Sequence, residues 1–256
     1  MALSIDGHAA AAWSGSSSGT VSLTTTHPND LIVVVAAMEF STGTHAIVNS
    51  VAKTSGTGTV GTFARRGSIY ADSVPNTGFS TAPGMSLEYW WGVATTVLTG
   101  AVFTVQSAAA VDDAYLGAFA VNFDSVNVPV WTSNASCPKS ASNITSVGSV
   151  PTVAGISTNA AAILLGLMLT SHNSVNTIGS GYAMIDAAVN TGGTNQMSFD
   201  EEEQLFAALQ SGISVPFGTS VFPWFMLADA IEAPAVGGMP PAAPLLPNTQ
   251  LWYSYP

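Results

Sequence analysis

The run Leu31-Ile-Val-Val-Val-Ala-Ala37 decides the class of fold. An unbroken apolar run of this kind, rich in β-branched residues, is typical of a strand that is covered on both faces. It is too short to cross a bilayer, which takes about 20 apolar residues. A second apolar run, residues 160–169, has the same character. The sequence therefore predicts buried central strands in both halves of the chain, and no transmembrane segment.

In the rest of the chain, most sequence patterns also predict strands. Residues 85–91 alternate with a period of two and place a large aromatic set on one face. Turns rich in Gly, Pro and Asn separate the candidate strands. Helical signals are few, and only residues 93–98 and 204–209 are expected to form one or two turns. The predicted fold is all-β, an antiparallel jelly-roll-like β-sandwich, because two sheets closing over one core limit exposed edges. Further strands are expected at residues 21–26, 101–106 and 114–122.

The chain also repeats itself in three blocks that keep their order. Residues 25–33 read like 157–165, residues 85–87 like 197–199, and residues 115–121 like 225–231. The offset between partners drifts from 132 to 112 to 110, as loop deletions would produce.

These blocks predict an internal twofold pseudo-repeat. A β-sandwich domain is expected over residues 1–233, with half-repeats of about 1–127 and 128–233. Two tandem small sandwiches, divided within residues 127–149, are the structural alternative.

The composition changes after Ala233. Residues 234–256 are rich in proline, which excludes a helix or an interior strand, so an extended C-terminal arm is predicted. The arm ends in an aromatic cluster, for which three interpretations stay open. It docks in a neighbouring subunit, it folds back on its own domain, or it is disordered. The residues expected to serve assembly are Leu251, Trp252, Tyr253 and Tyr255.

Charge is scarce and one-sided. Charged residues make up 7% of the chain, against about 25% in an average soluble domain, and 4 Lys and Arg face 15 Asp and Glu. Binding to nucleic acid or to an anionic membrane surface needs clustered Lys and Arg, and only Arg65 and Arg66 are adjacent. We therefore expect no nucleic-acid partner and no membrane insertion. A surface with few charges suits burial against other copies, which predicts a homo-oligomer.

No strong catalytic signature is present, and the protein is predicted not to be an enzyme. Asp112 and Asp113 are adjacent on a strand and point to opposite faces, so they cannot form the carboxylate pair of a glycosidase. The acidic run 200–203 is predicted to be a solvated turn. Its alternatives are a calcium site or a single carboxylate in a glycoside-active cleft, together with Glu88. No other cofactor or metal is expected, because the histidines are scattered. The sequence also contains no nucleophile elbow, the Gly-x-Ser-x-Gly turn that carries a catalytic serine.

Aromatic faces stack on the apolar faces of sugars, so a carbohydrate- or receptor-binding module is the alternative function. Trp90 and Trp131 are the candidate glycan contacts, on the expectation that they are more exposed than the other tryptophans. Cys137 lies in a loop rich in Ser and Asn and is interpreted as a passive thiol.

Four segments together resemble tailed-phage and prophage structural proteins: residues 4–9, 24–33, 87–94 and 224–232. The resemblance covers residues 3–233 and carries no catalytic residue. It implies a virion component with a jelly-roll-like sandwich, namely a minor tail, decoration or fibre protein. The implied partners are other virion proteins and a host surface glycan. The N-terminus lacks the basic region of a secretory signal, which agrees with a particle assembled in the host cytoplasm.

Overall fold

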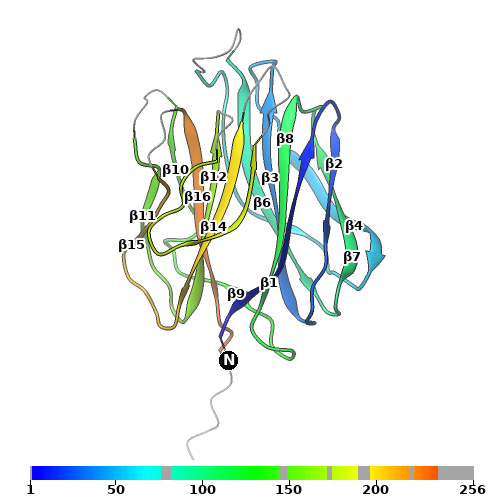
Figure 1. Ribbon diagram of the computed structural model, residues 1–256, viewed down its shortest axis with the longest axis vertical. Coiled ribbons are helices and arrows are strands. Elements are labelled where there is room, and N and C mark those ends of the chain that lie inside the picture. The colour runs from blue at the N-terminus through cyan, green and yellow to red at the C-terminus, as the bar shows by residue number, and fades with distance from the viewer. Residues whose placement is uncertain are drawn as a thin grey trace, which may run out of the picture.

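The computed structural model describes residues 2–75, 82–144, 149–171, 175–189, 197–218 and 222–235. Over these residues the protein is all-β, as the sequence predicts (Figure 1). The expected helical turns are wrong. Residues 93–94 close one strand and residues 204–206 close another, because cross-strand pairing continues to their ends.

The strands of the first half are β1 (Ser4–Trp13), β2 (Ser18–Leu23), β3 (Asp30–Phe40), β4 (Val48–Thr57), β5 (Ala64–Ala71), β6 (Gly84–Ala94), β7 (Thr99–Ser107) and β8 (Asp113–Asn122). Those of the second half are β9 (Val130–Trp131), β10 (Lys139–Asn143), β11 (Thr152–Ile156), β12 (Ala162–Thr170), β13 (Ala183–Val189), β14 (Ser198–Phe206), β15 (Ile213–Pro216) and β16 (Trp224–Glu232).

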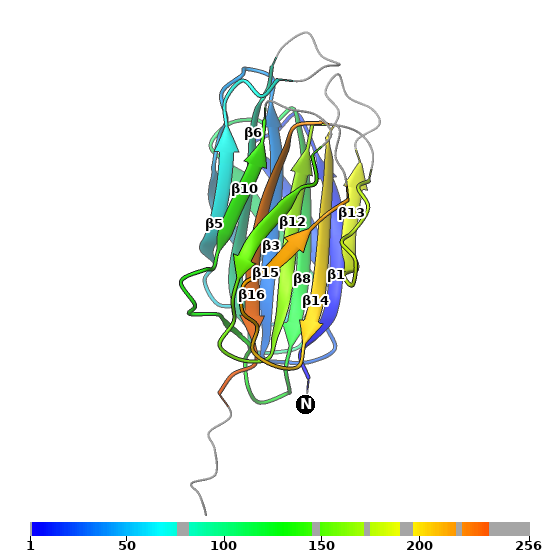
Figure 2. The same cartoon turned by 90° about the vertical axis from the view of Figure 1, so that its left-hand side faces the viewer.

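These strands build four antiparallel sheets. The first half forms a large sheet, β1-β8-β3-β6-β5, and a small one, β2-β7-β4. The second half forms a large sheet, β10-β16-β12-β14-β13 with β9 beside β16, and a small one, β11-β15. The two large sheets pack face to face, and each small sheet covers the outer face of its own large sheet (Figures 1 and 2).

Three apolar clusters fill the spaces between the four layers. The central cluster joins the two large sheets, and an outer cluster lies under each small sheet. Residues 31–37 of β3 are all apolar because both faces are covered: Val33 and Val35 belong to the central cluster, whereas Val34 and Ala36 belong to an outer one. The predicted burial of residues 31–37 on both faces is confirmed. Burying each such side chain contributes about 1.5–3 kcal/mol.

The strand order is the same in both large sheets when each half is taken in chain order. Strands β3, β6 and β8 hold the positions that β12, β14 and β16 hold in the other sheet. The three similar sequence blocks fall on these three pairs of strands. Each half therefore builds its own pair of sheets, and the halves share the central core. This order supports the twofold pseudo-repeat and the jelly-roll-like topology, which stay predictions.

The start of β1 and the end of β16 lie at the same end of the molecule, the lower end in Figure 1. The expected assembly residues Leu251, Trp252, Tyr253 and Tyr255 lie outside the described residues. Among the elements that are described, none is a helix able to span a membrane.

Candidate functional site

The acidic run 200–203 is not a solvated turn. It lies inside β14, between β12 and β13, and the side chains of Asp200, Glu201 and Glu202 are 0% exposed. Pairing with both neighbouring strands holds these residues in the sheet, and Met197 and Phe199 just before them belong to the central core. Acidic residues are almost never fully buried without a partner, so residue type alone predicted the wrong environment.

Two of these acids bind the chain that leads into β13. Asp200 accepts hydrogen bonds from the backbone N–H of Asn176 at 3.2 Å and from its Nδ2 at 2.7 Å. Glu202 accepts one from the backbone N–H of Gly179 at 2.7 Å. Burial raises the pKa of both carboxyls to about 7, although these hydrogen bonds act in the opposite direction.

Glu201 points the other way, into the central core. A Cβ atom at Gly117 of β8 would lie 2.1 Å from its Oε1, so the glycine makes room for the carboxyl. Burial, and then Asp186 nearby, raise the pKa of Glu201 well above its ordinary value. Because the acids alternate between two faces of β14, they do not converge on one cation or one substrate. Within the described ranges, no group of three or more Asp, Glu, His or Cys is placed to hold a metal.

Carboxylates elsewhere in the chain also accept hydrogen bonds from loop backbones. Glu88 accepts one from the N–H of Val48 at 2.8 Å, and Glu232 accepts one from the N–H of Asn159 at 2.6 Å. The recurrence indicates that many acids of this chain act as internal acceptors for the backbone.

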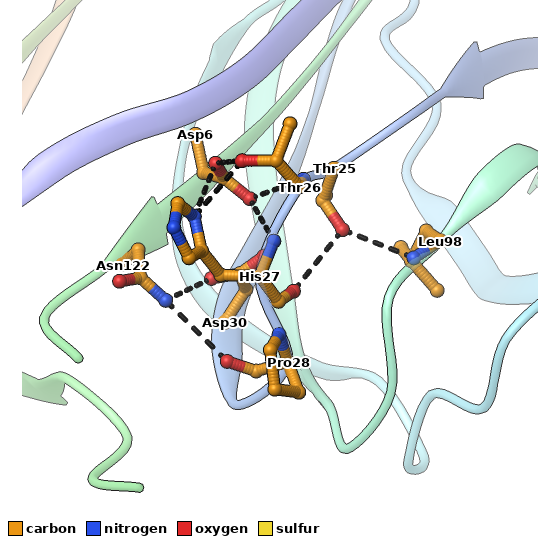
Figure 3. Close-up of polar contacts among 8 residues, drawn as sticks. All are labelled: Asp6, Thr25, Thr26, His27, Pro28, Asp30, Leu98 and Asn122. Carbon is orange, nitrogen blue, oxygen red and sulfur yellow. Dashed lines mark hydrogen bonds and ion pairs between the residues drawn. The ribbon is translucent and has the colours of Figure 1, made fainter. Parts of the chain in front are cut away.

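Asp6, Thr26 and His27 form the densest polar cluster near the lower end (Figure 3). Asp6 of β1 accepts the backbone N–H groups of Thr26 and His27, at 2.7 and 2.9 Å. Its Oδ1 lies 2.7 Å from Nδ1 of His27, and the Thr26 hydroxyl lies 2.9 Å from that same nitrogen. In a catalytic triad the hydroxyl and the carboxylate contact different ring nitrogens. This geometry is therefore a clamp on the turn before β3 and not a nucleophile.

The same turn is held from its other side. Asn122 donates from Nδ2 to Oδ1 of Asp30 at 2.6 Å and to the carbonyl of Pro28 at 3.4 Å, and Thr25 accepts from the N–H of Leu98 at 3.0 Å (Figure 3). No spacing pattern in the sequence indicates this cluster, because Asp6 lies twenty or more residues from its partners.

Replacing Asp6 with Asn is expected to lower the free energy of unfolding by about 1–3 kcal/mol, because the backbone N–H groups of Thr26 and His27 lose a charged acceptor. Burial favours a higher pKa for Asp6, but the hydrogen bonds from Thr26 and His27 hold it below its ordinary value. The contribution of Asp6 is therefore present at neutral pH and is lost as the pH falls through its folded pKa. Urea unfolding at pH 7 measures the effect. Thr26→Ser keeps the hydroxyl and serves as the control, and an unchanged midpoint in the Asp6 variant would contradict the clamp.

A second polar cluster joins the two halves of the chain, and we call it the seam cluster: Arg66, Tyr89, Trp131 and Asp229. Arg66 of β5 donates from Nε to Oδ2 of Asp229 of β16 at 2.8 Å, and from Nη2 to Oδ1 at 3.3 Å. The Tyr89 hydroxyl donates to the same Oδ2 at 2.5 Å. The guanidinium lies 5.2 Å from the centre of the Trp131 ring. Asp229 is 2% exposed, so this is a buried ion pair with its hydrogen bonds satisfied.

The two candidate glycan contacts lie apart from each other. Trp90 is half-buried and packs on the outer cluster beneath β2-β7-β4. Trp131 is half-buried, packs on the central cluster and lies 5.6 Å from the Tyr89 ring. The structure does not bring the two indoles together, and a glycan contact by either one stays a prediction. Cys137 is half-buried too, and burial, with Asp229 nearby, raises the pKa of its thiol to about 11.

Replacing Trp131 with Ala is expected to lower the free energy of unfolding by about 2–4 kcal/mol, because the indole packs on the core and under Arg66. Trp131→Phe, which keeps an aromatic ring, is expected to recover most of that loss. Urea unfolding followed by circular dichroism measures both variants. A Trp131→Ala protein as stable as the parent would show that the indole is a surface group, available for a ligand.

A scan against protein-family models, a search of curated proteins and a search of solved structures found no match.

Proposed function

We propose that this protein is a non-enzymatic structural subunit that works within an assembly of copies of itself and other proteins. A phage particle, with the chain as a decoration, minor tail or fibre protein, is the setting that the sequence resemblance suggests. One observation carries the proposal: all four cations of this protein contact other groups of the same chain, and most of its acids are buried.

All four cations show this engagement. Lys53 and Lys139 each donate from Nζ to a backbone carbonyl at 2.7 Å, that of Gly56 and that of Ala154. Arg66 pairs with Asp229 and Arg65 lies 3.5 Å from Glu88. The described surface is therefore poor in unpaired cations, although Arg65 and Lys139 are exposed. Burying such a surface against a neighbour avoids the cost of desolvating charges.

The positions of the cations also bear on how copies would meet. Lys53 lies on β4, Arg65 and Arg66 on β5 and Lys139 on β10, and each of these strands is at the edge of its sheet. Charge on an edge strand blocks strand-to-strand addition between copies. We therefore place the contacts between copies away from the edges formed by β4, β5 and β10.

Light scattering on the full chain tests this function. An oligomer is expected whose mass changes little between about 50 and 500 mM salt, because exposed charge pairs are screened over that range and uncharged contacts are not. A monomer at every concentration would overturn the proposal. A mass that collapses with salt would also overturn it, since it would show contacts made by charges.

A further inference from the structure

An apolar hollow of about 130 Å³ opens at the end of the molecule where the described chain stops. It lies at the lower end of the central core, and both halves contribute to it. The first half supplies Leu3 and Phe123, which flank β1 and β8, and the second supplies Leu205 and Phe206 at the end of β14. The remaining lining residues are Ala2, Ala161, Ala207 and Ala233.

The hollow has the chemistry to take part of an aromatic side chain, and its volume is slightly below that of a cavity that holds benzene. A cavity of about 150 Å³ lined by apolar groups holds a benzene molecule. Phe123 and Phe206 are only half-buried, and Leu205 is 48% exposed, so apolar surface faces solvent at the mouth. No charged side chain lines the hollow.

The sequence beyond the hollow supplies a matching group. Ala233 is part of the lining, and the chain that follows it runs to residue 256 and carries its aromatic cluster at residues 252–255. Four prolines, at positions 240, 241, 244 and 247, favour an extended polyproline II course between the two. At about 3.1 Å per residue, an extended stretch from Pro240 to Leu251 would span about 34 Å.

The sequence-predicted length favours docking in a neighbouring subunit over folding back. The arm begins at the rim of the hollow, and the prolines predict an extended segment whose end would lie away from that rim. The aromatic end is therefore poorly placed to return to the hollow of its own chain, and well placed to reach that of another.

We propose that the aromatic end of the arm, residues 251–255 of one copy, binds in the apolar hollow of a second copy. This inference rests on the proposed function, because it names the contact by which the subunits assemble. Arm and hollow are different surfaces, so the contact is head-to-tail and generates rings or open chains.

The test uses the full chain and light scattering. Leu205→Asp and Ala207→Glu place a charge at the mouth, on side chains that are already exposed, and each is expected to convert the oligomer to a monomer. Leu209→Asp is the matched control, because Leu209 is 63% exposed and does not line the hollow, and it is expected to leave the mass unchanged. A triple variant of the arm, Trp252→Ala, Tyr253→Ala and Tyr255→Ala, is expected to be a monomer too.

Mixing distinguishes a neighbour's hollow from the chain's own. The Leu205→Asp protein keeps an intact arm, and the arm variant keeps an intact hollow. Their mixture is expected to form a one-to-one dimer, although each is a monomer alone. Circular dichroism confirms that every variant is folded.

An oligomer that persists in both hollow variants would overturn the inference and leave the proposed function standing. A parent chain that is monomeric would overturn both. Monomeric variants that do not form a dimer on mixing would also overturn the inference, because the arm then contacts something other than this hollow.

Discussion

Replacing Arg66 with Ala is expected to lower the free energy of unfolding by about 3–5 kcal/mol, because it leaves the buried Asp229 carboxylate without its cation. Arg66 is 21% exposed and Asp229 is 2% exposed, so water does little to replace the lost charge. The substitution also removes the donor to the Thr132 carbonyl and the cation above the Trp131 ring. Since these contacts cross between the halves, the whole fold is expected to lose stability cooperatively. Urea unfolding at pH 7, with linear extrapolation, measures the loss.

The neighbouring cation provides a matched control. Arg65→Ala is expected to cost about 1 kcal/mol or less, because Arg65 is 44% exposed and its contact with Glu88 is 3.5 Å long. Equal losses in the two variants would contradict the special role of the seam cluster. A double variant, Arg66→Met with Asp229→Leu, removes both charges and is expected to recover part of the loss. If it recovers none, then the hydrogen bonds and not the unpaired charge set the cost.

The strands could be predicted where the sequence pattern is local. Residues 31–37 show by composition alone that β3 is covered on both faces, and the alternation of residues 85–91 indicates β6. The number of sheet layers could not be predicted from local sequence patterns. Strand β4, for example, carries mostly Ser, Thr and small residues, and only Val48 and Val51 are buried in the outer cluster beneath its sheet. A short polar strand of this kind differs little from a loop until its partner is known.

The polar clusters were not predictable, because their members are distant in the chain. Arg66 and Asp229 are separated by 163 positions, and nothing in either local sequence indicates the other. The prediction for the acidic run 200–203 was wrong for a different reason. Its four residues read as a turn by composition, but the strand pairs on both of its sides and the apolar residues before it hold it in the sheet. Cross-strand pairing therefore outweighs the preference of acidic side chains for water. The resulting burial raises the pKa values of these carboxyls.

Those raised pKa values predict that the protein is more stable in mild acid than in mild base. Burial raises the pKa of Glu39 to about 8, with Asp113 and Asp112 nearby adding to the effect, and it raises those of Asp30, Asp200 and Glu202 to about 7.

Near pH 5 the folded state therefore holds protons that the unfolded state has released. The stability from these groups is complete below their unfolded pKa values, and it is lost as the pH rises through 7 to 8. The expected slope is about −1.4 kcal/mol per pH unit for each extra proton held, which amounts to several kcal/mol between pH 5 and 8.

Glu39→Gln isolates one of these protons. Glu39 is 1% exposed, and neither of its carboxyl oxygens has a hydrogen-bond partner among the described residues, so an amide replaces the neutral acid at little cost. The variant is expected to lose about 1.4 kcal/mol per pH unit from the slope between pH 5 and 8, and to be more stable than the parent at pH 8. Asp124→Asn is the control. Hydrogen bonds from the side chain and backbone of Asn127 and from the backbone of Val126 lower the pKa of Asp124, so this carboxyl titrates below that window and its loss leaves the slope unchanged. Urea unfolding at pH 5, 6, 7 and 8 gives the slopes.

A parent protein whose stability rises with pH over this range would contradict this prediction. It would show that the buried carboxyls are ionised, with their charges stabilised by neighbouring groups, and that the acids of the core are not held as neutral groups.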